Sequence, residues 1–366
     1  MPNSQKSLPS LKKKFSIHDI ARDLEVSATT ISFVLNGGTQ GKKVSEPVKQ
    51  KILDYVQSIG YKPNLVARSL RTGKSRIIGM LVEDISDPFF SSIGRIIEDN
   101  LYEHGYKIFH SSTDNNTARS KDLLRIFRER QVDGYIIAPS PGIESDIQHI
   151  LNDARPVVLF DRFFPGLDTT NVIIDNAGGT YKAAIHLIGN GFISIAFITI
   201  DSEQVQMMDR LKGYNLAMTA NKLPSSILKI KYAEYKSAPA KIAARVKEFI
   251  TNNDSVDALL FATNYLAVCG LQAISELGLK IPHDIGVVGF DDNTHFSLFT
   301  PTITAVAQPV TEISKQTVQQ LLSALTADEK IKKGKIIVLE TNLIVRESSV
   351  RINEINELKT KHVLTK

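Results

Sequence analysis

The hydrophobic pattern at the start of the chain predicts a short amphipathic helix. Ile17, Ile20 and Leu24 stand three and four residues apart, so their side chains fall on one face of a helix. Ser16 precedes them as a candidate N-cap, and Asp19 three residues later completes a weak capping box. We therefore expect a helix with a capped start over residues 16–24.

A second helix is expected to begin after Ser27 and to run through Leu35. Ile31 shares its face with Leu35, whereas Thr29 and Phe33 lie about 160–200° away from Ile31. Two short helices joined by a tight turn form a helix-turn-helix pattern. Phe33 has two interpretations at this point: contact with a partner outside the module, or packing against the next helix.

A third helix is expected from the Ser-Glu-Pro sequence at 45–47 to Gly60. Val48, Ile52 and Val56 repeat every four residues along it, and a glycine is common just after a helix end. Three short helices around a small shared core are typical of DNA-binding modules whose second helix enters the major groove.

From Ile77 onward, short apolar runs alternate with helical stretches. The runs are continuous and rich in Ile and Val, which is typical of parallel strands buried on both faces. Such alternation builds doubly wound α/β sheets, and about 270 residues exceed one sheet, so two lobes with a cleft are expected. The predicted strands are 77–82, 106–111, 134–138, 156–160, 171–175, 194–200, 257–262, 284–290 and 335–340.

Polar side chains follow the ends of these strands. Ligands of open α/β sheets bind beyond the carboxyl ends of the strands, and carboxylates, amides and aromatic rings at such positions suit a neutral polyol. Asp175 and Asp201 have a simpler interpretation as strand ends or helix caps. The polar positions are Asp84, 87–90, 111–114, Ser140, 161–162, 175–176, Asp201, 263–264 and 291–292.

The charge distribution separates the same two regions. Residues 1–76 hold fourteen Lys and Arg against five Asp and Glu, a net charge of +9, whereas the remaining 290 residues hold 30 against 34. A basic segment joined to a mildly acidic body indicates a polyanion-binding module. Together with the helix-turn-helix pattern, this charge makes double-stranded DNA the expected partner.

Several other classes of protein are disfavoured. The single cysteine, Cys269, excludes an internal disulfide, and His110, His186 and His295 lack the spacing of metal ligands. The phosphate-loop-like sequence at 72–75 lacks the first glycine, and no nucleophile elbow occurs. We therefore expect no catalytic site, no metal and no cofactor.

A membrane location is likewise disfavoured. The longest uncharged apolar run, 191–200, has 10 residues, whereas a membrane helix needs about 20. No apolar segment follows the basic N-terminus, so secretion is not expected. The cytoplasm is the expected location.

The sequences SIHDIARDLEVSATTISFVLN and VSEPVKQKILDYVQSIGYKPNLVARSLRTG resemble the headpiece and hinge of the lactose-repressor family of bacterial transcription regulators. The resemblance implies a hinge helix at 63–70, too short to be stable alone, with Leu70 as a wedge in the minor groove. The sequence departs from the family pattern in two places, and both bear on the operator sequence. Phe33 stands where a basic or small residue is usual, and the loop at 37–43 is longer than in the family. The implied DNA contacts are Ser27, Ala28, Thr29, Thr30, Ser32, Phe33, Asn36, Arg68 and Leu70.

The body resembles the periplasmic sugar-binding fold that this family carries as its effector domain, through ISDPFF, VVLFDR, MMDRLKGY, LGLKIPHDIGVVGFDD and ITAVAQP. The resemblance implies Arg210 as a forked donor to the effector and Asp291 as a paired acceptor. In a structural alternative, Asp161 and Asp291 pair with the arginines at 162 or 210. A Thr-Asn pair stands at 263–264, where Asn-Asp is common. The implied effector contacts are Asp87, Phe89, Phe90, Ser140, Asp161, Arg210, Thr263, Asn264, Asp291 and Gln308.

The expected architecture is a small all-α helix-turn-helix headpiece followed by an α/β body of two doubly wound parallel-sheet lobes. The expected parts are a flexible basic tail (1–13), the headpiece (14–62), a hinge helix and linker (63–75), a two-lobed effector-binding and dimerisation domain (76–350) and a tail (351–366). The first lobe is expected to take about 76–176 and 308–333, and the second about 177–307 and 334–350.

The expected function is a sequence-specific transcriptional regulator, a repressor by family resemblance, that binds near-palindromic operator DNA as a homodimer. A small ligand between the lobes is expected to control operator affinity. A sugar is the first candidate for this ligand, and a nucleobase or another metabolite is the alternative. A solute-binding protein without a regulatory role is disfavoured by the basic headpiece and the missing signal sequence.

Overall fold

The computed structural model describes residues 15–36, 44–61, 69, 72–231, 238–326 and 334–351. The chain separates between Ser75 and Arg76 into two units, which is the boundary expected between linker and body. The predicted basic tail, the predicted C-terminal tail beyond Arg351 and most of the predicted hinge lie outside the described residues. Within the described ranges, no helix combines the length and the apolar character needed to cross a bilayer.

The first unit contains the three predicted helices. Ser16 and Asp19 form the predicted capping box, because the Ser16 hydroxyl accepts from the Asp19 amide and the Asp19 carboxylate accepts from the Ser16 amide. Gly60 follows the third helix with a left-handed φ of 61°, the conformation that favours glycine. The helices are α1 (Ile17–Asp23), α2 (Ala28–Asn36) and α3 (Glu46–Ser58).

Each helix contributes one isoleucine to the centre of this unit. Ile20, Ile31 and Ile52 have no exposed surface and pack together in one cluster. The Tyr55 hydroxyl of α3 donates to the Asp23 carboxylate of α1 over 2.8 Å, which ties the third helix to the first. The face of α2 opposite this core is thereby left available to a partner.

The second unit consists of two lobes, each built on one six-stranded sheet. The sheets have the same strand order, β11-β5-β4-β3-β1-β2 and β12-β10-β9-β8-β6-β7. All neighbouring strands are parallel except β10 and β12, which are antiparallel. The first sheet contains β1 (Ile77–Val82), β2 (Lys107–Ser112), β3 (Gly134–Ile137), β4 (Val157–Phe160), β5 (Thr170–Ile174) and β11 (Ile336–Leu339).

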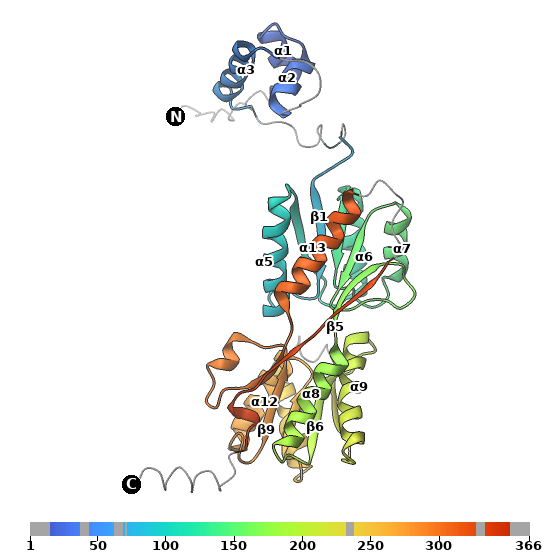
Figure 1. The fold of residues 1–366 in the computed structure, drawn as a ribbon, viewed down its shortest axis with the longest axis vertical. Coiled ribbons are helices and arrows are strands. Elements are labelled where there is room, and N and C mark those ends of the chain that lie inside the picture. Colours follow the sequence, from blue (N-terminus) through green and yellow to red (C-terminus); the bar gives the residue numbers. More distant parts are fainter. Residues whose placement is uncertain are drawn as a thin grey trace, which may run out of the picture. The chain divides into compact units, whose positions relative to one another are not determined.

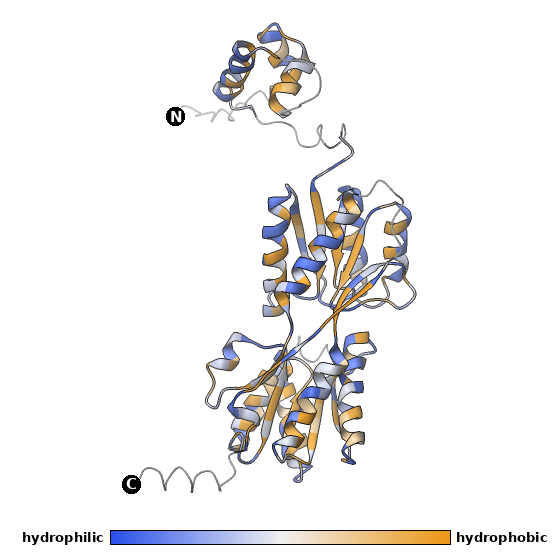
Figure 2. Ribbon diagram, in the orientation of Figure 1, coloured by the Kyte–Doolittle hydropathy of each residue, from blue (hydrophilic) through white to orange (hydrophobic). Residues whose placement is uncertain are grey.

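The second sheet repeats this arrangement, and helices cover both sheets (Figure 1). The helices turn their apolar faces toward the strands and their polar faces outward (Figure 2), as doubly wound sheets require. The strands are β6 (Ile195–Ile200), β7 (Ser226–Ile230), β8 (Ala258–Phe261), β9 (Gly286–Phe290), β10 (Thr304–Ala307) and β12 (Asn342–Ile344). The helices are α5 (Pro88–Glu103), α6 (Thr117–Glu129), α7 (Glu144–Asn152) and α13 (Val310–Thr326) in the first lobe, and α8 (Asn176–Gly189), α9 (Val205–Ala220), α11 (Pro239–Thr251) and α12 (Asn264–Leu277) in the second.

The nine predicted strands are all present, and three further strands were not predicted. β7 carries Lys229 and alternates between half-buried and exposed positions because it lies at a sheet edge, while β10 and β12 have only four and three residues. Burial on both faces holds for central strands such as β3 and β8. It fails at the edge strand β2, whose side chains alternate.

The predicted assignment of residues 334–350 to the second lobe is wrong for β11. This strand pairs in parallel with β5, with Ile336 beside Asn171 and Leu339 beside Ile174, and so completes the first sheet. The chain then passes to the second lobe, where β12 pairs with β10. Three segments therefore connect the lobes, after β5, after β10 and between β11 and β12 (Figure 1).

Candidate functional site

The headpiece presents one face of α2 away from its core. Thr29 is exposed on that face, as its position opposite Ile31 predicts. Ser27 caps the helix, since its hydroxyl accepts from the Thr30 amide over 3.0 Å and shares a hydrogen bond with the Thr30 hydroxyl. Ala28 packs against the headpiece core. The hydroxyls at 27 and 30 thus also hold the start of the helix.

Phe33 is half-buried, but it is not among the described side chains that pack against the headpiece core. The α3 side chains in that core are Val48, Ile52, Tyr55 and Val56. Ser32 is half-buried, and Asn36 is the last residue of α2. Arg68 and Leu70, the other predicted DNA contacts, lie outside the described residues. The DNA contacts of this helix remain predictions.

In the body, polar residues from both lobes line a cavity of about 60 Å³. Most of them stand at or just beyond the carboxyl ends of strands, where ligands of α/β sheets bind. Nine of the ten predicted effector contacts are among its lining residues. The lining consists of Glu83, Asp87, Phe89, Phe90, Asn115, Asp161, Arg162, Ile200, Gln204, Gln206, Met207, Arg210, Thr263, Asn264, Tyr265, Asp291 and Gln308.

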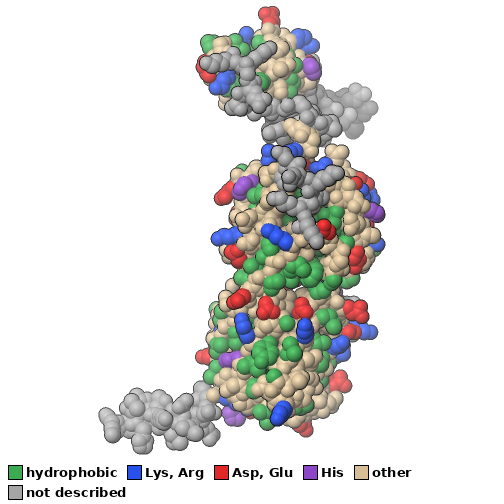
Figure 3. Space-filling view, turned by 45° about the vertical axis from the view of Figure 1, so that its right-hand side comes forward, with side chains coloured by type: hydrophobic (Ala, Val, Ile, Leu, Met, Phe, Trp, Pro, Cys, Tyr) green, Lys and Arg blue, Asp and Glu red, His purple; other side chains and the backbone are tan. Residues whose placement is uncertain are grey.

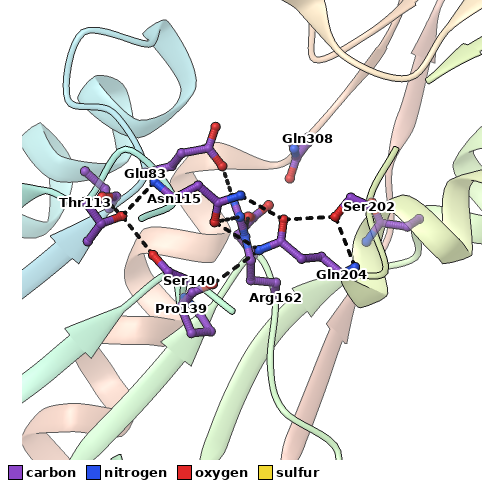
Figure 4. Close-up of polar contacts among 12 residues, drawn as sticks. Glu83, Thr113, Asn115, Pro139, Ser140, Arg162, Ser202, Gln204 and Gln308 are labelled. Atoms are coloured by element: carbon purple, nitrogen blue, oxygen red, sulfur yellow. Dashed lines mark hydrogen bonds and ion pairs between the residues drawn. The ribbon is translucent and has the colours of Figure 1, made fainter. Parts of the chain in front are cut away.

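Ser140 is the predicted effector contact that lies outside this cavity. Its hydroxyl donates to the Thr113 hydroxyl over 3.1 Å (Figure 4). It also accepts from the Ser120 hydroxyl over 2.8 Å, and the side chain is buried. Ser140 therefore ties the segments that follow β2 and β3 to α6. Its predicted contact with the effector is not supported by this geometry.

Arg162 forms a buried network at the first-lobe side of the cavity. Its guanidinium donates to Asp161 and to Glu83, each over 2.8 Å, and to the Asn115 carboxamide over 3.4 Å. Burial acts to lower the pKa of Arg162, but the carboxylates of Asp161 and Glu83 outweigh it and raise that pKa. The structural pairing considered for Asp161 is thus present, and the same carboxylate also lines the cavity.

Arg210, on α9, stands at the second-lobe side of the cavity and is 2% exposed. Its Nε donates to Asn176 over 2.8 Å, its Nη1 donates to the Ala262 carbonyl over 2.6 Å, and the guanidinium stacks on the Phe290 ring at 3.6 Å. Nη1 also lies 3.5 Å from Asp291. Among the described residues Nη2 has no hydrogen-bond partner, so this end of the fork remains available to a ligand.

Asp291 and Asp87 bring two carboxylates into the same cavity from opposite lobes. Gln308 donates to Asp291 over 2.5 Å. Burial raises the pKa of Asp291, against the opposing effects of Arg210 and Gln308. Burial and the Asp291 charge raise the pKa of Asp87 to about 6. Asp87 caps α5, because its Oδ1 accepts from the Phe89 amide over 2.8 Å.

Apolar rings form another part of the cavity wall. Phe89 and Phe90 follow Asp87 on the first turn of α5 and meet edge to face, with centroids 5.1 Å apart. Thr263 caps α12 through the Leu266 amide, which leaves Asn264 at the first position of that helix. A cavity with rings on one side and amides and carboxylates around them can hold a small hydroxylated molecule.

Two carboxamides join the lobes directly beside the cavity. Asn115 follows β2 in the first lobe, and its Nδ2 donates to the side-chain Oε1 of Gln204 over 3.3 Å. Gln204, at the start of α9, donates back from its Nε2 to the Asn115 Oδ1 over 3.2 Å (Figure 4). Gln204 also donates to the Pro139 carbonyl over 3.5 Å. This reciprocal pair bridges the lobes and separates the small cavity from an outer one.

The outer cavity has a volume of about 570 Å³ and shares Asn115, Arg162, Ile200 and Gln204 with the inner one. Asp201 and Glu203 stand on its second-lobe side. Acidic side chains follow the boundary between the lobes on the face seen in Figure 3. The outer cavity is thus lined by three carboxylates, those of Glu144, Asp201 and Glu203, and by the Arg162 guanidinium.

Sequence reasoning missed several lining residues. Glu83 follows β1 and Asn115 follows β2, so their strand-end positions were an available signal. Gln204 and Gln206 stand at the start of α9, where no strand end indicates them. Asp175 caps α8 through the Gly178 amide at 2.7 Å, so its simpler interpretation is confirmed. The described residues contain no group of His, Cys, Asp and Glu side chains suited to a metal.

Comparison with known proteins gives consistent relatives. Residues 16–64 match the model of bacterial regulatory proteins of the lacI family, and residues 184–349 match that of the periplasmic binding protein-like domain. The HTH-type transcriptional regulator RegA of Clostridium saccharobutylicum is 34% identical over 342 residues, covering 92% of this chain and 99% of the relative. The ribose operon repressor of Haemophilus influenzae is 28% identical over 334 residues, covering 91% and 98%.

A solved structure supports the fold over nearly the whole chain. The lac repressor dimer bound to operator and an anti-inducer matches with a TM-score of 0.79 at 23% identity, covering 93% of this chain and all of the other. The relatives are transcriptional regulators and not enzymes, in agreement with the sequence. The match to RegA exceeds 30% identity and covers almost the whole length of both proteins. The chain therefore belongs to the lacI family of bacterial regulatory proteins.

Proposed function

We propose that this regulator is a repressor whose affinity for a near-palindromic operator is controlled by a small sugar bound between the two lobes. The observation that carries the proposal is the cavity itself. It combines the free Nη2 of Arg210, the carboxylates of Asp87 and Asp291, and the Phe89–Phe90 pair within one cavity between the lobes.

The chemistry of the lining favours a sugar as the effector. Hydroxyl groups both donate and accept, so one sugar can satisfy carboxylate acceptors and the Arg210 donor together. The apolar face of a sugar ring stacks on aromatic planes such as Phe89. One relative carries the name of a ribose operon repressor.

The DNA-binding role rests on α2 of the headpiece. Thr29 would hydrogen-bond a base edge and Phe33 would contact a thymine methyl in the major groove. Ser27, Ala28, Thr30, Ser32 and Asn36 would contribute contacts along the same helix. Arg68 would contact phosphates, and Leu70 would open a base step in the minor groove. Operator binding implies action in the cytoplasm, where the DNA lies.

A homodimer would present two headpieces to the two half-sites of the operator. The body offers exposed apolar side chains for such a contact: Tyr102 of α5 is 70% exposed, Val268 of α12 46%, and Leu298, just after the short helix η1 (Thr294–Ser297), 78%. These elements lie on the same side of the body in Figure 1. We therefore place the dimer contact on this side of the body.

Ligand and operator would then be coupled through the lobe angle. Sugar binding changes how the lobes meet, and this change sets whether the two hinge segments at 63–70 can pack together on DNA. The coupling is reciprocal, because a ligand that alters operator affinity must have its own affinity altered by the same factor.

Two linked measurements test this function. Selection from random duplexes should yield a near-palindromic sequence that the full-length protein prefers. A thermal-shift screen of sugars, sugar phosphates, nucleobases and amino acids should find a sugar that raises the Tm and changes affinity for the selected duplex. A protein without duplex preference, or one stabilised by nucleobases alone, would contradict the proposal.

A further inference from the structure

The charges around the inner cavity do not balance. Four carboxylates and two guanidiniums line it, a formal excess of two negative charges. Arg162 pairs with Asp161 and Glu83, each at 2.8 Å, and Arg210 lies 3.5 Å from Asp291. The remaining carboxylate, Asp87, forms no ion pair with any residue that the structure describes.

Asp87 stands across the cavity from Asp291. Its Oδ1 accepts from the Phe89 amide, its Oδ2 lies 3.5 Å from the Asn264 carboxamide, and the Phe90 amide also interacts with the carboxylate. The amino end of α5 favours a negative charge at this position. Burial and the charge of Asp291 oppose that charge, which raises the pKa of Asp87 to about 6, so the carboxylate is mostly ionised at pH 7.5.

Two other acceptors in the cavity lack a donor. The side-chain oxygens of Gln206 and Gln308 are buried and have no hydrogen-bond partner in the described part of the chain. Gln206 is 3% exposed, and both residues line the cavity. A buried acceptor without a donor is unfavourable, so a ligand that supplies hydrogen-bond donors would relieve it.

We propose that the cleft excludes anionic sugars, and that Asp87, facing Asp291 across the lobes without a cation of its own, is the residue that sets this selectivity. The proposal rests on the sugar-binding function proposed above and narrows it to one chemical class. The effector is then a sugar without phosphate or carboxylate groups, and it binds through donated hydroxyl protons.

This site favours a ligand that carries no negative charge and that donates hydrogen bonds, and a phosphate group has neither property. It carries a charge of about −1.5 to −2 at pH 7, which meets the excess negative charge in a space of low dielectric constant. Its ionised oxygens accept hydrogen bonds and do not donate them, so they cannot satisfy Asp87, Gln206 or Gln308. Both arginines are already committed to carboxylates, which leaves the single Nη2 of Arg210 to compensate.

The test compares matched pairs of probes on the full-length protein at pH 7.5 by calorimetry. The pairs are ribose with ribose 5-phosphate, glucose with glucose 6-phosphate, fructose with fructose 6-phosphate and galactose with galactose 1-phosphate. For any neutral sugar that binds, we expect its phosphate to bind at least about a hundredfold more weakly. Equal affinity, or binding of the phosphate alone, overturns the proposal and leaves the sugar-binding function standing.

Two variants assign the selectivity to Asp87. Asp87→Asn keeps the side-chain size and removes the charge, so the preference for the neutral member of a pair should narrow about tenfold. Glu248→Gln removes one charge from an exposed site on α11 and should leave the preference unchanged. An unchanged preference in Asp87→Asn, or an equal narrowing in both variants, overturns the assignment.

A measurement on the unmodified protein covers the case in which Asp87→Asn does not fold. Glucuronate keeps its charge between pH 5 and pH 7.5, whereas Asp87 becomes mostly protonated over this range. The preference for glucose over glucuronate should therefore narrow at pH 5, and a constant preference overturns the proposal. A protein that binds no sugar of either kind removes the proposed effector class and this selectivity with it.

Discussion

Asp161 and Asp291 occupy the same position in the two lobes. Asp161 follows β4 and Asp291 follows β9, the corresponding strands of two sheets with one strand order. Both have a left-handed backbone, with φ of 65° and 68°, and both amides donate to the neighbouring strand, at the carbonyls of Val172 and Val306. A left-handed conformation is costly for a residue other than glycine, and such residues cluster at functional sites.

This symmetry predicts that the Asp291 carboxylate serves the ligand more than the fold. Asp291→Asn retains a residue that tolerates the left-handed backbone, and Arg210 keeps its hydrogen bonds to Asn176 and the Ala262 carbonyl, so we expect a smaller loss of Tm than in Arg210→Ala. Loss of a charged acceptor should weaken sugar binding at least about tenfold, because such hydrogen bonds contribute about 1.5–3 kcal/mol. Asp292→Asn is the matched control, since Asp292 pairs with Arg346 and does not line the inner cavity. Equal affinities of the two variants in calorimetry would contradict the assignment.

Arg210 is expected to serve both stability and binding. Arg210→Ala leaves Asp291 buried without its cation, which should destabilise the body by about 3–5 kcal/mol. Arg210→Lys keeps the charge but loses the paired hydrogen bonds of the guanidinium to Asn176 and to the Ala262 carbonyl. This variant should still fold, and it should bind sugar at least tenfold more weakly. Thermal unfolding and calorimetry separate the two effects. An Arg210→Ala protein as stable as the unmodified protein would contradict this account.

The Asn115–Gln204 bridge is expected to favour the closed arrangement of the lobes. Gln204→Ala removes hydrogen bonds to Asn115 and to the Pro139 carbonyl, each contributing about 1 kcal/mol. If ligand binds the closed form, its affinity should fall about fivefold to thirtyfold. Small-angle scattering without ligand should report a larger radius of gyration. Unchanged affinity and radius would show that the bridge does not influence closure.

The raised pKa of Asp87 predicts a stability that depends on pH. Because this pKa rises from 3.8 to about 6 on folding, the folded protein holds the proton more firmly. The resulting stabilisation is present below about pH 4 and is lost as the pH rises through about 6. Asp87→Asn lacks this effect. As the pH rises from 5 to 7.5, the Tm of the variant should therefore increase by a few degrees relative to the Tm of the unmodified protein. A Tm difference that stays constant with pH would refute the shift.

Phe33 is expected to act on DNA and not on the stability of the headpiece. It does not pack against the described core, so Phe33→Ala should leave the Tm of the headpiece nearly unchanged and reduce the preference for operator over random duplex. The salt dependence of binding should persist, because it reports phosphate contacts. Ile31→Ala removes a fully buried side chain and should cost about 2–5 kcal/mol. A comparable loss of stability in Phe33→Ala would favour packing against α3.

Local sequence patterns predicted the elements well because their causes are local. Capping residues such as Ser16 and Ser27 and continuous apolar runs such as 77–82 require no knowledge of distant contacts. The strand-end rule also found Asp161 and Asp291, since both lobes are built in the same way. The fold class and much of the candidate site were therefore predictable.

The remaining features depend on long-range packing. β11 follows a first-lobe helix and precedes a second-lobe strand, so only its pairing with β5 decides its lobe. Ser140 follows a strand end like the lining residues do, yet Ser120 and Thr113 occupy its hydroxyl. Gln204 was missed because its role arises from a contact with Asn115 of the other lobe, 89 residues away in the sequence.

We expect the sugar site of the body and the operator site of the headpiece to be thermodynamically coupled. The most direct measurement is the affinity of the identified sugar for the full-length protein, alone and with saturating selected operator, by calorimetry at one salt concentration. Operator should change the sugar affinity by the same factor by which the sugar changes operator affinity, about 5- to 150-fold. A sugar affinity that is identical with and without operator would contradict it.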